Sequence, residues 1–383
     1  IFFFKNIKNI LFVEYKKKYL LNRHVAESRN VTVKQRFIKE VRANFLQIFG
    51  ITGSLDGDMF LQYRYTEKNK EGIYEVKVDI SKDFNELFEM LENRSKEIHN
   101  HPDPILELTE REIKEFFNDK TDVVYIPAGR SMITLLSNQM NYIYSSMDDI
   151  QKRNMDYCTR SYLEKILQMK SVFTISPVEM LNDVIAMTYI KIDEERAKEA
   201  ISLMKQLLQG EYINKDGEER LQVSKNRYVK LNYASSGQQE VVWILNVLFY
   251  YLLNGESTYF IIEEPESHLF PNSQKLVMEF IALVCNGNGN QLFLTTHSPY
   301  ILGTINNLLY ADKVSKDVDE SQLSRIISKN KWLNYDKVNA IFVQNGKIKS
   351  CLDEEFKSIE NEVIDGVSEQ INEDYDKMLE LKG

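Results

Sequence analysis

Three short apolar runs in the sequence each end abruptly in polar or charged residues. They are VVYI at 123–126, YFII at 259–262 and LFLT at 292–295, followed by PAGR, EEPE and THSP respectively. Continuous apolar runs of this length are typical of strands buried on both faces of a parallel sheet. In an open α/β sheet, ligands bind at the carboxyl ends of the strands. The sequence therefore predicts an α/β fold with a ligand site where these polar residues gather.

The second run leads into Glu263, Glu264 and Glu266, three like charges within four positions. Such charges repel one another and burial raises that cost, so a positive partner is expected nearby. In phosphoryl-transfer proteins, the first acid after such a strand helps to hold Mg²⁺ and the second orients or deprotonates the attacking water. A bound Mg²⁺ would offset the clustered charge. Taken alone, EEPE is explained about equally well as a solvated acidic turn.

Two neighbouring segments favour the nucleotide interpretation. The strand at 292–295 is followed by His297, which can donate a hydrogen bond to a terminal phosphate. Upstream, Ser235, Ser236 and Gly237 stand at the start of a long apolar helix, where free N–H groups and the helix dipole attract anions. Each feature alone has an ordinary explanation, as a structural histidine or a serine cap. All of them in this order favour a nucleotide site.

The order and the residue patterns of these segments resemble those of the ATP-binding-cassette type of AAA ATPase head, in the branch that contains SMC, RecF and OLD-like (overcoming lysogenization defect) proteins. ASSGQ at Ala234–Gln238 resembles the signature motif of that branch. FIIEEPESHLFP at 260–271 resembles Walker B with its D-loop, and FLTTHSP at 293–299 resembles the switch-histidine segment. VVYIPAGR at 123–130 is similar to the Q-loop strand. The resemblance implies a P-loop NTPase fold with a mixed sheet, an antiparallel lobe and a helical insertion.

The resemblance also implies roles for individual residues, with ATP and Mg²⁺ as cofactors. Glu263 would serve Mg²⁺, Glu264 would be the general base and His297 would sense the terminal phosphate. Together these roles predict hydrolysis of ATP to ADP and phosphate.

Other residues are implied in contacts between two copies of the chain. Ser235, Ser236, Gly237 and Gln238 of one copy would complete the ATP site of the other, which gives a homodimer closed around ATP. The usual Q-loop glutamine is not present. Arg130 lies in the same segment and is expected to take its place in contacting phosphate or a partner.

One expected element is not found. A P-loop reads Gly-x-x-x-x-Gly-Lys-Ser/Thr so that backbone N–H groups cradle phosphates. The only Gly-Lys is Gly346-Lys347, in the hairpin segment VQNGKIKS, and it does not fit this pattern. The chain begins at Ile1, and 1–12 has the pattern of a helix that would follow a P-loop. We expect an N-terminally truncated sequence that does not hydrolyse ATP appreciably by itself.

The patterns along the chain suggest an order of domains. Hairpin strands are predicted at 58–65 and 72–80, and a strand-turn-strand with its turn at Asp216-Gly217. The predicted division has four parts: an N-terminal ATPase lobe at 1–137, a helical insertion at 138–209, a second lobe with signature, Walker B and switch histidine at 210–310, and a tail with a hairpin and an acidic helix at 311–383. The insertion is expected to contact a partner or nucleic acid, although a passive helical cap explains it nearly as well.

The composition argues against several classes of protein. The net charge of −9 argues against a protein built to coat nucleic acid or an anionic membrane. Basic residues crowd the N-terminal region, where a solvated helix face explains them better than a binding patch. The three cysteines are far apart and show no CxxC, which fits a cytoplasmic protein without disulfides or zinc. No apolar run reaches the length of a membrane span. HNH at 99–101 spells the name of a nuclease family but lies in a proline-bounded loop, so it is interpreted as a coincidence.

Several functions remain open for the complete protein. The first is an ATPase whose dimerisation controls a partner, such as a separately encoded effector in bacterial defence or a DNA-processing protein. A module that has lost catalysis and the ATPase part of a nuclease complex are the alternatives. A chromosome or repair head with long coiled coils fits less well because the predicted insertion is short, and a transporter cassette fits least.

Overall fold

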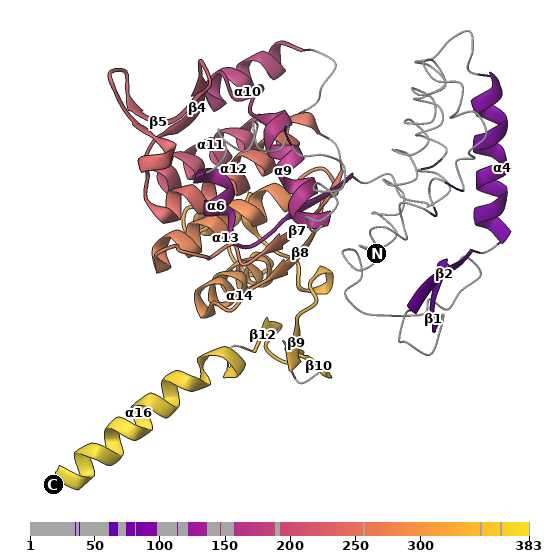
Figure 1. Cartoon of the computed structure of the whole chain (residues 1–383). Helices are drawn as coiled ribbons and strands as arrows, with labels where there is room; N and C mark the ends of the chain where they lie inside the picture. The colour runs from indigo at the N-terminus through magenta and orange to yellow at the C-terminus, as the bar shows by residue number, and fades with distance from the viewer. Residues whose placement is uncertain are drawn as a thin grey trace. The chain divides into compact units, whose positions relative to one another are not determined.

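The computed structural model describes residues 61–67, 74–80, 82–97, 122–135, 157–187, 192–255, 257–344, 347–360 and 362–382, together with residues 35, 38, 113 and 146. The chain divides into two compact units (Figure 1). The first contains Ile1–Val123 and Met147–Arg160, and the second contains Val124–Ser146 and Ser161–Gly383. The predicted helix at 1–12, the HNH segment at 99–101 and Gly346 lie outside the described residues.

The first unit contains the hairpin that the alternating pattern predicted. Strand β1 (Leu61–Glu67) pairs antiparallel with β2 (Tyr74–Ile80). Helix α4 (Lys82–Glu97) follows directly, and its Leu87, Phe88 and Leu91 are buried. These apolar side chains recur at helical spacing on one face, which gives the helix a packed side.

The sheet that positions the candidate site belongs to the second unit, apart from the first two residues of its strand β3 (Asp122–Ile126). The other strands are β7 (Thr258–Glu263) and β8 (Gln291–Thr295), and the order in the sheet is β3-β7-β8. Strands β7 and β8 are parallel, and the register sets Glu263 opposite Thr295. The carboxyl ends of the two strands therefore meet at one edge, as the sequence predicted for the segments EEPE and THSP.

Burial of the strands follows the prediction for β7 but not for β8. In β7, Thr258, Phe260, Ile261 and Ile262 are buried, so both faces of the strand are covered. In β8 the residues alternate between half-buried and exposed, and Phe293 remains 48% exposed. The prediction that β8 is buried on both faces was therefore wrong. Strand β8 is the terminal strand of the described sheet, and one of its faces stays open.

Helices pack beside this sheet and supply most of the core (Figure 1). The central helix is α12 (Ser236–Asn254), and almost every residue from Gln239 onward is buried. It packs against α6 (Arg130–Leu135), α11 (Glu194–Leu208) and α13 (Pro271–Cys285), while α13 also packs on α14 (Pro299–Val314). A helix that is apolar on nearly all sides belongs in the interior, which explains its central place.

Helices α9 (Tyr157–Met169), α10 (Pro177–Ala186) and α11 fall in the predicted insertion at 138–209. Side chains of all three, among them Ile166, Met180 and Leu203, belong to the same core cluster as the sheet. Residues 161–187 and 192–208 are thus integrated into the body of the second unit. Their proposed role as a projection toward a partner stays a prediction.

The predicted antiparallel lobe is present. Strands β4 (Glu211–Lys215), β5 (Glu218–Ser224) and β6 (Arg227–Lys230) form a three-stranded sheet in that order. Asp216 and Gly217 join β4 to β5 with φ values of 54° and 79°. Two consecutive left-handed residues are what a tight two-residue hairpin needs, so the predicted turn is confirmed.

A short 3-10 helix, η2 (Leu231–Tyr233), joins β6 to α12. The last part of the chain contains helix α15 (Glu320–Ser324), the 3-10 helices η3 (Lys329–Lys331) and η4 (Tyr335–Lys337), and helix α16 (Glu362–Lys382). Its strands are β9 (Ile341–Gln344), β10 (Lys347–Ser350), β11 (Leu352–Asp353) and β12 (Ser358–Ile359). Strands β9 and β10 confirm the predicted hairpin, and α16 the acidic helix.

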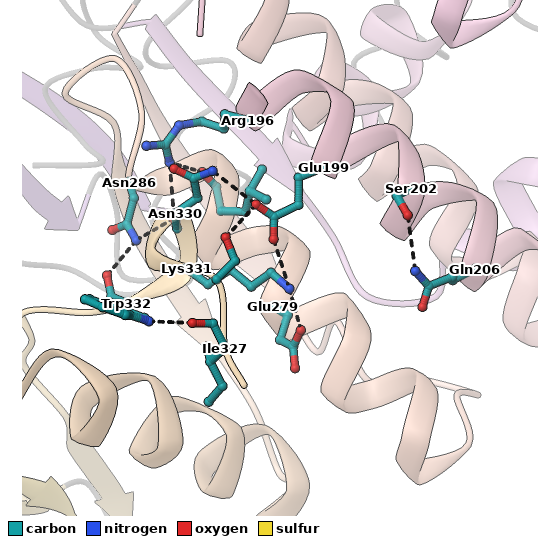
Figure 2. Close-up of polar contacts among 12 residues, drawn as sticks. Arg196, Glu199, Ser202, Gln206, Glu279, Asn286, Ile327, Asn330, Lys331 and Trp332 are labelled. Carbon is teal, nitrogen blue, oxygen red and sulfur yellow. Dashed lines mark hydrogen bonds and ion pairs between the residues drawn. The ribbon is translucent and has the colours of Figure 1, made fainter. Parts of the chain in front are cut away.

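A polar network fixes η3 against the helical core (Figure 2). Lys331 Nζ lies 2.8 Å from Glu279 Oε2 on α13 and 3.2 Å from Glu199 Oε1 on α11. Arg196 donates to the backbone carbonyls of Leu283 and Asn330 at 2.8 Å and 3.2 Å. Burial pulls the pKa of Lys331 down, but the hydrogen bonds and charges of the two acids outweigh it and raise the pKa above its usual value.

Candidate functional site

The carboxyl end of β7 is held by the buried side chain of Arg130. Its Nη1 donates to the carbonyl oxygens of Pro127 at 2.5 Å and Glu263 at 2.7 Å, and its Nη2 donates to that of Glu264 at 2.9 Å. Its Nε donates to the backbone carbonyl of Glu240 at 3.2 Å and lies 3.3 Å from the Glu240 carboxylate. Arg130 therefore connects the end of β3, helix α12 and the end of β7.

This placement differs from the role expected for Arg130. The side chain is 0% exposed, and its donors face backbone carbonyls and the Glu240 carboxylate. A direct contact to phosphate or to a partner needs an accessible guanidinium, so it has no support in this structure. Arg130 lies behind the site and positions the chain segment that carries the acids.

Glu263 points its carboxylate toward the end of the neighbouring strand. Its Oε2 accepts a hydrogen bond from the backbone N–H of Ala128 at 3.2 Å. The side chain is half-buried at the edge of the sheet. The bond ties the polar segment after β3 to the end of β7, as expected for two strands that lie side by side.

Glu264 and His297 are brought together across the ends of β7 and β8. Glu264 Oε1 lies 3.8 Å from His297 Nε2, and the two side chains are 41% and 88% exposed. Glu264 Oε2 accepts a hydrogen bond from Ser267 Oγ at 3.2 Å. The Glu264 backbone has a left-handed φ of 41°, and its N–H donates to the carbonyl oxygen of Thr295 at 3.0 Å. An accessible carboxylate and an accessible imidazole thus share one edge of the sheet.

The third acid, Glu266, has different partners. Its Oε1 accepts hydrogen bonds from Thr296 Oγ1 at 2.7 Å and from the backbone N–H of His297 at 2.8 Å. The acids that the sequence groups together therefore have different hydrogen-bond donors: Ala128 for Glu263, Ser267 for Glu264, and Thr296 with the backbone of His297 for Glu266. Their mutual repulsion is reduced because each carboxylate has donors of its own.

The predicted signature segment forms the start of α12. Ser235 is the N-cap: its Oγ accepts from the backbone N–H of Gln238, and the Gln238 side chain accepts from the backbone N–H of Ser235 in return. Gln238 Nε2 also donates to the carbonyl oxygen of Leu208 at 2.7 Å. Gln238 is thus engaged within its own chain, whereas Ser235 and Ser236 are exposed at the helix start.

Gly237 brings this helix start close to the loop that follows β7. A Cβ atom at this position would lie 2.9 Å from the carbonyl oxygen of His268 and 3.2 Å from a methyl carbon of Leu269. Only a residue without a side chain permits this approach. The signature segment and the acids are therefore joined within one chain by the loop between β7 and α13.

Residues 3–302 match the family model described as AAA ATPase domain. The chain belongs to the AAA ATPase domain family. Membership implies nucleotide binding, usually with Mg²⁺, and agrees with the parallel strands and flanking helices of the second unit. No curated protein matches this AAA ATPase domain. Within the helices that the structure describes, none combines the length and apolar character needed to span a membrane.

The acids at the end of β7 suit Mg²⁺ by their chemistry. Mg²⁺ prefers oxygen ligands and is commonly held by one or two carboxylates together with nucleotide phosphates and water. Glu263 and Glu264 offer carboxylate oxygens at the edge of the sheet. Across the described ranges, no three His, Cys, Asp or Glu side chains form a metal site by themselves. The donor set of this AAA ATPase domain therefore fits an ion that is held jointly with a nucleotide.

The sequence interpretation missed residues that support the site. Glu240 is fully buried within the apolar helix α12 and pairs with Arg130, and its carboxylate also accepts from the Arg130 backbone N–H at 2.9 Å. Thr134 Oγ1 donates to the carbonyl oxygen of Gln239 at 2.8 Å. A lone acid in an otherwise apolar helix is a usable signal, because a buried charge needs a partner. The partner itself lies in a distant segment.

Proposed function

We propose that this AAA ATPase domain binds and hydrolyses ATP at the carboxyl ends of β7 and β8. The observation that carries the proposal is the accessible pair of Glu264 and His297, whose side-chain atoms lie 3.8 Å apart. A carboxylate beside an imidazole provides a base for the attacking water and a hydrogen-bond donor for the terminal phosphate. The backbone of Glu264 is held by Arg130 and Thr295, so the carboxylate is oriented before a ligand arrives.

Glu263 would hold Mg²⁺ in this proposal, with Glu264 adjoining it. When bound, the ion would supply positive charge that offsets the negative charge of the phosphates. Glu263 keeps its orientation through the hydrogen bond from the backbone N–H of Ala128.

The proposal includes ATP-driven dimerisation of the kind found in the SMC, RecF and OLD-like branch. Ser235, Ser236 and Gly237 would contact the ATP of a second copy, because helix starts favour anions and the two serines are exposed at the start of α12. Dimerisation would control a partner, such as a separately encoded effector or a DNA-processing protein, in the cytoplasm. The dimerisation and the control of a partner are supported by the resemblance of the motifs to those of that branch.

The test uses the natural full-length protein with Glu264→Gln, which is nearly isosteric and keeps Glu263. If Glu264 is the base, kcat for ATP should fall by about 10²–10⁴-fold. The variant should still bind ATP and accumulate as a dimer, measured by size-exclusion chromatography with multi-angle scattering with and without Mg-ATP. Ser236→Arg is the matched comparison: its bulk blocks the contact to the second copy, so it should stay monomeric with ATP.

Two results would contradict the proposal. Hydrolysis by Glu264→Gln at the parent rate would remove Glu264 as the base. A parent protein that binds ATP but neither hydrolyses it nor changes size would favour a regulatory module without catalysis. The sequence contains no GxxxxGK[ST] motif, and this observation is what makes that second function a candidate.

A further inference from the structure

Glu266 joins the turn after β7 to the turn after β8. One carboxylate oxygen, Oε1, accepts from the hydroxyl of Thr296 at 2.7 Å and from the backbone N–H of His297 at 2.8 Å. The other oxygen, Oε2, is buried and has no hydrogen-bond partner among the residues that the structure describes. The carboxylate is therefore directed at the switch-histidine segment and not at solvent.

A chain of hydrogen bonds extends this connection. Thr296 Oγ1 accepts from the backbone N–H of Ser298 at 3.0 Å, and Ser298 Oγ donates to Gln274 Oε1 at 2.5 Å. Gln274 Nε2 in turn donates to the carbonyl oxygen of Leu269 at 2.8 Å. The chain starts in the loop after β7 and returns to it. The two turns are thus fixed to each other at both ends of that loop.

The position of His297 is fixed by the hydrogen bond of its backbone N–H more than by contacts of its imidazole ring. Its imidazole is 88% exposed, and the contact given for it by the structure is the one to Glu264 at 3.8 Å. Its backbone N–H, in contrast, is held by a short bond to a carboxylate, and bonds to charged acceptors are about twice as strong as neutral ones.

We propose that Glu266 is a positioning residue that sets His297 against Glu264. This inference rests on the proposed ATPase function, because it assigns the third acid of EEPE to the geometry of the catalytic pair. Glu266 is not available as a metal ligand, since one oxygen has two donors and the other is buried. It acts on the reaction through the backbone of His297 and does not touch the nucleotide.

The first test measures steady-state ATP hydrolysis by the full-length protein. Glu266→Ala removes both acceptor bonds, and a displacement of about 1 Å at a catalytic group costs on the order of 10²-fold in rate. We expect kcat to fall by about that factor while KM for ATP stays near the parent value. Glu266→Gln keeps an oxygen that can accept both bonds, so it should restore most of kcat. Equal loss in both variants, or parent kcat in Glu266→Ala, would overturn the proposal.

The second test does not depend on turnover. Protein labelled with ¹⁵N-histidine gives signals from five residues, and the variant His297→Gln identifies the signal of His297. In Glu266→Ala, the backbone amide proton of His297 should shift upfield and exchange faster with solvent, while the signals of the histidines outside the loop of Glu266 and His268 stay in place. Glu266→Gln should lie close to the parent and shows that the fold is retained.

The two tests separate the failure of each idea. If the His297 amide signal shifts in Glu266→Ala but the parent protein hydrolyses no ATP, the contact between Glu266 and His297 is supported and the proposed ATPase function is refuted. An unchanged His297 amide in Glu266→Ala would refute the positioning role, whatever the ATPase activity. A general shift of all histidine signals in both variants would also refute it, because the effect would then be global unfolding.

Discussion

Arg130→Met tests whether the buried arginine stabilises the body that carries the site. Methionine has a similar length and fills the same space, but it donates no hydrogen bonds. The substitution leaves Glu240 buried without its cation, and the carbonyl oxygens of Glu263 and Glu264 lose the hydrogen bonds from Arg130, although the Glu264 carbonyl keeps the backbone N–H of Ser267. The second unit should therefore be strongly destabilised.

The size of the effect follows from the broken ion pair. Both side chains of the pair are almost completely buried, at 0% and 1% exposure. Removing one partner of such a pair costs about 3–5 kcal/mol, because the remaining charge is left uncompensated. The carbonyls that lose Arg130 add to this cost only where neither another donor nor water replaces it. We expect a loss of about 3–5 kcal/mol in the free energy of unfolding.

Tryptophan fluorescence during urea unfolding measures this loss in the right part of the chain. The two tryptophans, Trp243 and Trp332, both belong to the second unit and are 0% and 8% exposed. Their emission therefore reports on the body that contains Arg130. Arg227→Met is the matched control, because Arg227 is exposed on β6 and the change should stay within about 0.5 kcal/mol.

A double-mutant cycle separates the ion pair from general packing effects. Glu240→Gln removes the charge that Arg130→Met leaves behind but keeps an acceptor for the backbone N–H of Arg130. The double variant should be more stable than the sum of the single losses predicts, by a coupling of up to about 3 kcal/mol. If Arg130→Met unfolds within about 1 kcal/mol of the parent, the network does not carry the stability assigned to it.

Two further predictions concern close packing around the site. Gly237→Ala adds a Cβ only 2.9 Å from the carbonyl oxygen of His268, so the helix start or the loop must shift. Urea unfolding should show a loss of about 1–3 kcal/mol in the free energy of unfolding. An unchanged midpoint would contradict the close approach. Lys331→Met removes the buried cation of Glu279, which keeps only the exposed Lys275 at 3.6 Å, so the loss should be about 0.5–3 kcal/mol. Adding Glu279→Met should recover part of that loss, and no recovery would argue against the ion pair.

The elements that carry the site could be predicted because their signals are local. The strands β7 and β8 show continuous apolar runs, and the turn between β4 and β5 shows Asp216-Gly217, whose left-handed φ values are confirmed. The start of α12 was indicated by Ser235, which is the N-cap. Each of these features is decided by a few neighbouring residues, which is why periodicity and turn chemistry suffice.

The roles of Arg130 and Glu266 could not be predicted because their partners are distant in the sequence. Arg130 meets Glu240 and the end of β7, more than a hundred positions later, and Glu266 meets Thr296 and His297, about thirty positions later. A charged residue beside a strand end looks the same in sequence whether it faces a ligand or a carbonyl. Only the fold decides which of the two it meets, so contact with phosphate was a reasonable but unsupported expectation for Arg130.

The conformation of Glu264 explains how an acidic segment can follow a buried strand. Its φ of 41° is uncommon for a residue with a side chain, and such a conformation costs about 1–3 kcal/mol unless its surroundings fix it. Here the N–H of Glu264 bonds to Thr295 and its carbonyl oxygen accepts from Arg130, so both sides of the residue are fixed. The chain reverses at this point, and the carboxylates before and after it reach different donors. Glu263 accepts from the backbone of Ala128 and Glu266 from the turn after β8, so closely spaced acids can follow the strand without facing one another.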